Sequence, residues 1–276
     1  GPIIKGLTMA FNMLKKTVID TFFAVDTVTK GFDRATHMGN KYNAGMKQNY
    51  LETRRFGVTM EDLGKQYQSL IANVSDFSLL SAEAGNKVAK NIAMMQQLGV
   101  ETEDITKGMQ VSMKMFGQSL EGADETAREL LSTAEALQVP PQQLASDYAR
   151  MGGSLAKLGR DGPQAFKELA RVSKITGMEM EKMLQITDKF DTFEGAATQA
   201  GQLNAALGGN FVNAMDMMMT TDPVQRFEQL RNAITSTGLT FDDMSYYQRQ
   251  FFTNAMGLND VGDLALMMSG NMDMMS

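Results

Sequence analysis

The longest uninterrupted hydrophobic pattern of the chain covers residues 3–36. Apolar side chains recur there at alternating spacings of three and four residues, and Thr21 takes the single polar step. A seam of this kind, continued over about four heptads, is typical of a coiled coil. We therefore predict a long amphipathic helix whose apolar stripe mediates self-association. The candidate self-association residues are Leu7, Phe11, Leu14, Val18, Val25, Val28 and Phe32.

The same stripe has a second interpretation. Ile3, Ile19, Phe22 and Phe23 make it wider than a strict two-position seam. An amphipathic helix that packs against its own domain also shows a stripe of that width. Both interpretations predict a helix over this segment, and they differ in whether another chain covers its apolar side chains.

Downstream, the hydrophobic pattern predicts a series of shorter helices. No window shows a run of alternating β-branched residues, so we predict no strands. The fold class is all-α: an array of short helices with glycine-marked turns, preceded by a longer coiled-coil-like helix. Residues 37–56 are expected to form a turn and a second, more polar helix. The further expected helices cover residues 60–73, 77–97, 103–115, 122–138, 140–158, 163–176, 179–189, 194–207, 223 onward, 241–255 and 260–269. Residues 267–275 are rich in methionine and show no periodicity.

A short pattern recurs between these helices, as in Phe56-Gly57-Val58-Thr59-Met60-Glu61-Asp62. Glycine can take the left-handed conformation that ends a helix, and the Thr or Ser that follows can cap the next one. Thr59 with Asp62, and Thr240 with Asp243, resemble capping boxes. The predicted helix-stop glycines are Gly57, Gly99, Gly117, Gly177, Gly238 and Gly257. A variant without glycine begins at Leu137-Gln138-Val139.

Charge divides the chain into two predicted domains. Residues 1–56 contain nine Lys/Arg and four Asp/Glu (+5), whereas residues 57–276 contain 17 and 28 (−11), which together give the net charge of −6. We therefore expect a basic helical segment over 1–56, with a possible role in oligomerisation, and an acidic multi-helix domain over 57–276. A charge of +5 with interspersed acids is too mild to predict a specific nucleic-acid site.

Composition excludes several other classes. The chain has no cysteine, which excludes disulfides and thiolate metal sites and fits a reducing compartment. No apolar run approaches the roughly 18 residues that a membrane span needs, and no signal peptide is visible. The opening Gly1-Pro2 resembles a protease-cleavage scar, so we expect a fragment of a longer protein.

Candidate catalytic chemistry is sparse. His37 is the only histidine and there is no cysteine, so pairs of Cys with His and clustered His ligands are excluded, and a lone His near a helix end is most often a surface residue. Ser154-Leu155-Ala156-Lys157 matches the S-x-x-K pattern of penicillin-interacting enzymes, but the companion S-D-N and K-T-G elements are absent. A pattern of four residues arises readily by chance.

Acid pairs and methionines have structural interpretations as well. Asp188 with Asp191, or Glu179 with Glu181, could serve a glycosidase only if they face each other across a cleft, and helix-face charge explains them more simply. The 25 methionines suit helix packing better than copper(I) binding, which usually adds Cys or His ligands. We therefore predict no catalytic residue, no metal site, no cofactor and no enzyme activity.

The run Ala136-Leu137-Gln138-Val139-Pro140-Pro141-Gln142-Gln143-Leu144-Ala145-Ser146-Asp147, continued by Gly152-Gly153-Ser154-Leu155-Ala156-Lys157-Leu158-Gly159, resembles the core region of phage tail tape-measure proteins. The Phe56–Asp62 unit, the Gly201–Gly209 segment and the helix start at Asp222-Pro223 have the same character, so the resemblance extends over roughly residues 55–270. Family members are usually much longer, and many carry membrane-active apolar stretches that this chain lacks.

The resemblance implies a structural component of the phage tail, present in the virion and assembled in the host cytoplasm. Members of the family occupy the tail tube as helical oligomers, help to set tail length and are ejected during infection. Tube proteins and tail-tip or hub proteins are the implied partners, beside copies of the chain itself. Two alternatives stay open: a cellular helical adaptor that binds partner helices through methionine-rich faces, and a helical domain that cleaves peptidoglycan.

Overall fold

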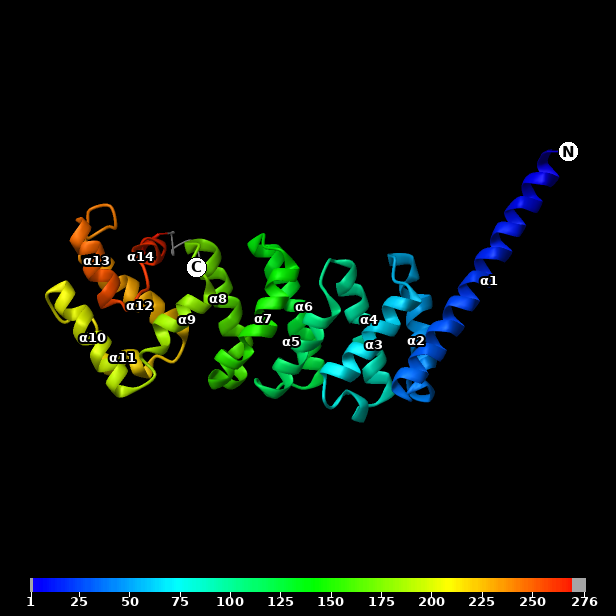
Figure 1. The fold of residues 1–276 in the computed structure, drawn as a ribbon, viewed down its shortest axis with the longest axis horizontal. Coiled ribbons are helices and arrows are strands. Elements are labelled where there is room, and N and C mark those ends of the chain that lie inside the picture. The colour runs from blue at the N-terminus through cyan, green and yellow to red at the C-terminus, as the bar shows by residue number, and fades with distance from the viewer. Residues whose placement is uncertain (1, 270–276) are drawn as a thin grey trace. The chain divides into compact units, whose positions relative to one another are not determined.

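The computed structural model describes residues 2–269, and every regular element in this part of the chain is a helix (Figure 1). The predicted all-α class is therefore confirmed. The α-helices are α1 (Pro2–Thr36), α2 (Gly39–Thr53), α3 (Met60–Asn73), α4 (Ala82–Gln97), α5 (Thr102–Lys114), α6 (Leu120–Leu137), α7 (Pro141–Leu155), α8 (Gly162–Thr176), α9 (Met180–Asp188), α10 (Phe193–Leu207), α11 (Ala214–Met219), α12 (Pro223–Thr235), α13 (Tyr246–Ala255) and α14 (Val261–Met268). Most of the methionine-rich tail, residues 270–275, lies outside the described residues.

The chain forms two compact units. Unit 1 comprises residues 1–114, 118–132 and 140–149, and unit 2 comprises residues 115–117, 133–139 and 150–276. The boundary expected at residue 56 from charge does not separate two cores, because Phe32, Tyr42 and Met46 belong to the same buried cluster as the helices that follow. The net charge of a segment depends mainly on its exposed side chains. The division into units depends on how the buried side chains pack.

Unit 1 is built around four aromatic rings from α1, α2, α3 and the 3₁₀ turn Phe77–Leu79. Phe32, Tyr42, Tyr67 and Phe77 are all at most 1% exposed, and successive ring centroids lie 5.4–6.4 Å apart. Edge-to-face and stacked contacts at these distances add to the free energy of apolar burial. The C-terminal part of α1 is thus anchored by its own domain.

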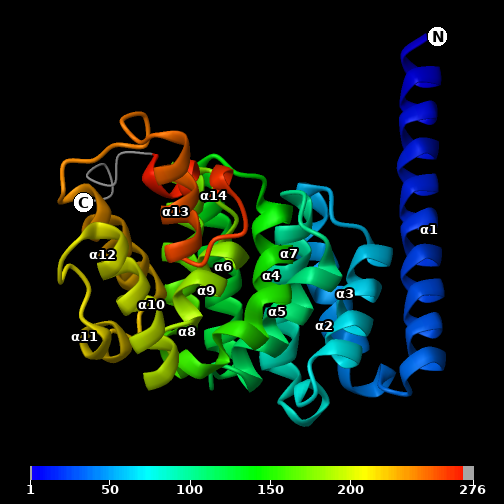
Figure 2. The ribbon, with the colours of Figure 1, turned by 60° about the vertical axis from the view of Figure 1, so that its left-hand side comes forward.

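Unit 2 places α12 against α8 and α9, and α10 against α11 and α13 (Figure 2). Phe166 of α8, Met183 of α9 and Phe227 of α12 are fully buried. Within α8, buried positions recur at helical spacing, as Phe166, Leu169 and Ala170 show, so this helix presents one apolar face to its neighbours. Among the described residues, no helix combines the length and the apolar character that crossing a membrane requires.

All six predicted helix-stop glycines have a positive φ, between 67° and 90°. The variant without glycine also turns there, because Gln138 has a φ of 55°. Thr59 and Asp62 form a complete capping box at the start of α3, where each side chain bonds the backbone N–H of the other residue. The repeated pattern therefore marks the end of one helix and the start of the next.

Two helices begin about five residues later than predicted, and one helix was not predicted. The helix expected from residue 241 begins only at Tyr246, because Ser245 and Gln248 form the capping box and residues 241–244 form a turn. The helix expected from residue 77 begins at Ala82, where Ser81 caps it. The short helix α11 was not predicted, and Asn213 caps it by accepting two backbone N–H groups.

Gly99→Ala is expected to lower the free energy of unfolding of unit 1 by about 1–2 kcal/mol, the cost of a left-handed backbone for a residue with a Cβ. The effect isolates the backbone, because a Cβ at Gly99 would meet no atom within 4 Å. Gly31→Ala is the matched control, since Gly31 lies inside α1 with equally open space. That substitution should stabilise the helix by up to about 1 kcal/mol. Urea denaturation of both variants measures the difference, and equal signs for the two would contradict the turn assignment.

Candidate functional site

The N-terminal part of α1 carries large apolar side chains that no other described part of the chain covers. Figures 1 and 2 both show this end of the helix, in dark blue, running clear of α2, α3 and α4. The exposed fractions of these side chains lie between 43% and 78%. We use the name α1 face for the whole set of exposed apolar side chains, which contains the seam and also positions around the rest of the helix: Ile3, Ile4, Leu7, Met9, Phe11, Met13, Leu14, Val18, Ile19, Phe22 and Phe23.

The structure divides the seven candidate self-association residues into two groups. Leu7, Phe11, Leu14 and Val18 belong to the α1 face and are 66–67% exposed. The other three belong to unit 1, because Phe32 is 1% exposed and Val25 and Val28 pack against the same core. Each interpretation of the stripe therefore describes one part of the helix. The surface available to another chain is the part before residue 24.

The heptad positions e and g, which lie on either side of the seam, contain few charged side chains. With Leu7 and Leu14 at heptad position d, the e and g positions up to residue 24 contain one charged side chain, Lys15. These positions are Ile3, Thr8, Ala10, Lys15, Thr17, Phe22 and Ala24. Charged pairs at e and g usually select the partner in two-stranded coiled coils. An apolar face wider than the two seam positions instead suits a helix that packs between more than one neighbour.

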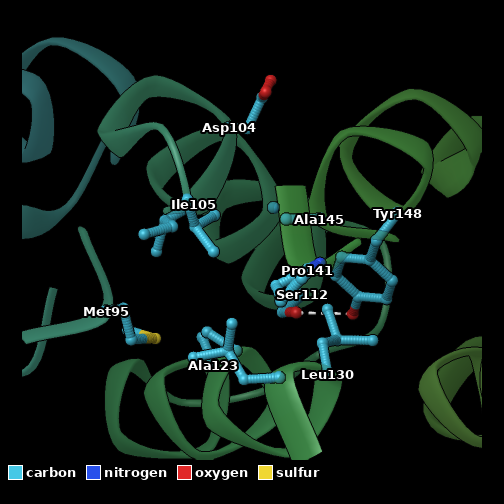
Figure 3. Close-up of a pocket in the computed structure, with 13 residues that line it drawn as sticks. Met95, Asp104, Ile105, Ser112, Ala123, Leu130, Pro141, Ala145 and Tyr148 are labelled. Carbon is cyan, nitrogen blue, oxygen red and sulfur yellow. Dashed lines mark hydrogen bonds between the residues drawn. The ribbon is translucent and has the colours of Figure 1, made fainter. Parts of the chain in front are cut away.

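A second candidate is an apolar pocket within unit 1, lined by α5, α6, α7 and Met95 of α4 (Figure 3). Figure 3 shows Ile105, Ala123 and Leu130 around the space and the Tyr148 hydroxyl directed toward Ser112. The two hydroxyl oxygens lie 2.6 Å apart. Burial raises the pKa of Tyr148 to about 12, so the phenol stays protonated at neutral pH.

The pocket is too small for an ordinary ligand. Its volume is about 20 Å³, and a single water molecule needs roughly 10–15 Å³. Asp104 at its rim already accepts a hydrogen bond from the Gln142 amide at 2.6 Å. The pocket is therefore a packing gap between α5, α6, α7 and the end of α4.

A third candidate is the ionic cluster of unit 2, which contains a buried arginine. The Arg226 side chain is 4% exposed, and its guanidinium donates to Asp191 at 2.5 Å. Lys157 donates to the same carboxylate and to Asp188 at 2.5 and 2.6 Å. Arg226 also donates to the backbone carbonyls of Thr187, Phe190, Met217 and Met218. The cluster ties the segments around α9, α11 and α12 together.

These contacts give structural roles to the lysine of the S-x-x-K pattern and to three of the four candidate acids, Asp188, Asp191 and Glu181. Burial alone would lower the pKa of Lys157, but hydrogen bonds to Asp188 and Asp191 outweigh it and raise that pKa. A protonated lysine cannot take the proton of Ser154. Likewise, burial alone would raise the pKa of Asp191, yet Arg226 and Lys157 lower it overall, so this carboxylate stays ionised. Glu181 of the other pair is bound by Arg150.

Asp124 of α6 is a buried acid that sequence reasoning did not identify. One carboxylate oxygen accepts from Asn91 at 2.7 Å, while the other has no hydrogen-bond partner within the described chain. Burial raises the pKa of Asp124 and is only partly offset by Asn91, Arg128 and Lys87. Asp124 is not among the residues that line the apolar pocket of unit 1, and we assign its effect to stability.

Asp124→Asn is expected to raise the free energy of unfolding of unit 1 at pH 7 by about 1 kcal/mol, because it removes a buried, half-satisfied charge. A raised folded pKa means that the native state binds the proton more tightly than the unfolded chain. The wild type therefore gains stability as pH falls through that pKa, and the advantage of the variant disappears. Urea denaturation at pH 7 and pH 4 measures both values. A variant that is less stable at pH 7 would contradict the assignment.

The methionines, His37 and the possible metal ligands are the remaining candidates from the sequence. Met46, Met183 and Met217 are among many methionines buried in the two units, as expected for adaptable filler side chains. His37 adopts a left-handed φ of 57° at the turn between α1 and α2. Within residues 2–269, no three His, Asp or Glu side chains lie close enough together to hold a metal ion.

Comparison with known proteins adds no constraint on function. No protein-family model, curated protein or solved structure matches this chain. What the chain does is therefore inferred from the α1 face, from the two units and from the sequence resemblance.

Proposed function

We propose that this chain is a non-enzymatic structural protein whose helical units are joined into a homo-oligomer through the α1 face. The observation that carries the proposal is the row of exposed apolar side chains on residues 3–23. An exposed apolar surface of this extent marks an interaction site in soluble proteins. Its heptad spacing complements a second copy of the same helix, because a seam at positions a and d can interlock with itself.

Order-of-magnitude energetics are compatible with association. The five seam side chains Ile4, Leu7, Phe11, Leu14 and Val18 are each 66–69% exposed. Completing the burial of one such side chain contributes about 1–2 kcal/mol, so five contribute about 5–10 kcal/mol per chain. Association itself costs about 4–15 kcal/mol. The remaining apolar side chains of the face must therefore be covered too, which favours a bundle of more than two helices.

A lipid surface is the competing occupant of the α1 face. Lys5, Lys15, Lys16 and Asp20 give residues 2–23 a net charge of +2, by count, which would suit anionic lipid weakly. The apolar residues of the seam alternate regularly at spacings of three and four, and this pattern favours partner helices over lipid on the α1 face. Sedimentation of the chain with anionic vesicles distinguishes the two: monomers that pellet with vesicles would overturn the homo-oligomer proposal.

We propose further that the assembly belongs to a phage tail, in the role of a tape-measure protein. Support comes from residues 136–159, whose sequence resembles that family, and from the repeated helix, glycine and cap units that the resemblance includes. The role comprises control of tail length or assembly, occupancy of the tail tube and ejection during infection. Nothing in the geometry favours the adaptor or the peptidoglycan-cleaving alternative over it.

Purified tails of a phage that encodes this chain test the tail proposal. Peptide mass spectrometry is expected to find the chain in intact tails in several copies per particle. An in-frame deletion of residues 3–23 should then yield particles whose tails are missing or irregular in negative-stain electron microscopy. Absence of the chain from purified tails, or normal infectious particles after the deletion, would overturn the proposal.

A further inference from the structure

Unit 2 contains an open polar cleft of about 450 Å³ that the proposed self-association does not use. One wall is the segment that leads from the end of α10 into α11, including Phe211, Asn213 and Asp216. The other wall is one side of α12. Its volume lies within the roughly 300–1,000 Å³ of small-molecule sites.

The α12 wall presents a stripe of polar side chains. Gln229, Asn232 and Ser236 line the cleft at spacings of three and four residues, so they lie on one side of the helix and its C-terminal end. Gln229 is held in place by a hydrogen bond from its amide to the Thr220 hydroxyl at 3.3 Å. Ala233 lies between the polar positions and adds no bulk, which leaves the side chains on either side of it open to a ligand.

The opposite wall is fixed by Asn204 of α10. Its side-chain oxygen accepts from the backbone N–H groups of Phe211 and Val212 at 2.9 and 2.8 Å, and its NH₂ group donates to the Val212 carbonyl at 2.8 Å. Asn213 uses its oxygen to cap α11, which leaves its NH₂ group as the donor for a ligand. A wall held in this way before binding loses little conformational entropy when a ligand arrives.

The chemistry of the two walls matches a neutral carbohydrate. Carboxamides both donate and accept, as sugar hydroxyls do, and Asp216 adds one carboxylate acceptor. The Phe211 side chain is 45% exposed, so its ring offers an apolar surface to the C–H face of a sugar. A single formal charge gives an ionic ligand little to bind. We propose that this cleft binds a neutral oligosaccharide of hexopyranose units.

Titration of the full chain with maltotetraose and with tetra-N-acetylchitotetraose, followed by saturation-transfer NMR, tests the proposal. At least one of them is expected to bind saturably with a Kd on the order of 1 mM, because an open cleft buries only part of its ligand. Asn232→Ala and Phe211→Ala should each weaken that binding about tenfold, the equivalent of one good contact. Both side chains are exposed, so the substitutions leave the core intact.

Gln202→Ala is the matched control, since Gln202 is an exposed amide on α10 that does not line the cleft. It should bind like the wild type. Absence of saturable binding to both sugars would overturn the proposal, as would equal binding by wild type, Asn232→Ala and Phe211→Ala. Binding of an extended polyalanine tetrapeptide in place of the sugars would overturn it as well, because carboxamides can also pair with a peptide backbone. The result is independent of the oligomeric state.

Discussion

Replacing Leu7 and Leu14 with glutamate is expected to dissociate the assembled protein into monomers of 30.3 kDa. Both leucines are 66% exposed and stand at the d positions of the seam. Two glutamates per chain would place like charges together in an apolar interface, where each buried unpaired charge costs several kcal/mol. Multi-angle light scattering at micromolar concentration measures the mass directly.

The matched control carries the same change in charge at positions of α1 outside the seam. Lys5→Gln with Asn12→Glu also lowers the charge by two, at two positions outside the seam. This variant should keep the mass of the wild-type assembly. The thermal transition of unit 1 should survive in both variants, since residues 3–20 are exposed and contribute no core contact. A Leu7→Glu and Leu14→Glu protein that keeps the wild-type mass would contradict the assignment of the interface.

Arg226→Met is expected to lower the free energy of unfolding of unit 2 by about 3–5 kcal/mol, because several backbone carbonyls would lose a charged hydrogen-bond donor, at about 1–3 kcal/mol for each acceptor left buried without a partner. The substitution removes the guanidinium from Asp191 and from four backbone carbonyls. Methionine roughly preserves the volume, so the loss reports polar contacts more than packing. Hydrogen exchange of the amides in α9 and α12 measures the local stability without assuming a two-state transition.

Lys157→Met provides the comparison for Arg226→Met. Lys157 binds the same Asp191 carboxylate, but its side chain is 41% exposed. Solvent screening limits such pairs to about 1 kcal/mol or less. Arg226 and Lys157 bind the same carboxylate, so the difference in stability between the two variants tests whether burial determines the contribution of each cation. Equal exchange rates in both variants would show that Arg226 is no more than a surface contact.

Local features of the fold could be predicted from sequence because their causes are local. The bounds 60–73 predicted for the third helix agree with α3, since Gly57 ends the preceding turn and the Thr59 and Asp62 capping box starts the helix. Both devices depend on residue types at a fixed spacing. Where two caps compete within a few residues, as Thr240 and Ser245 do, spacing alone does not decide which one starts the helix.

Features that depend on tertiary packing could not be predicted. Val18 and Phe32 follow the same hydrophobic period, yet one is 67% exposed and the other 1%, because only the second meets the rings of α2 and α3. Arg226 gives no sequence signal of burial, since its partners come from segments about 10 to 40 residues away. The polar cleft likewise depends on the hydrogen bond from the Asn204 side chain to the Val212 carbonyl, and residue spacing in the sequence does not predict this contact.

Sedimentation equilibrium of the unmodified chain between about 1 and 100 μM, a range that brackets micromolar affinity, tests self-association through the α1 face most directly. The account predicts a mass that is a multiple of 30.3 kDa, and the width of the apolar face predicts a multiple greater than two. A mass of 30.3 kDa throughout this range would contradict it, because the exposed side chains of residues 3–23 would then remain uncovered by a second copy.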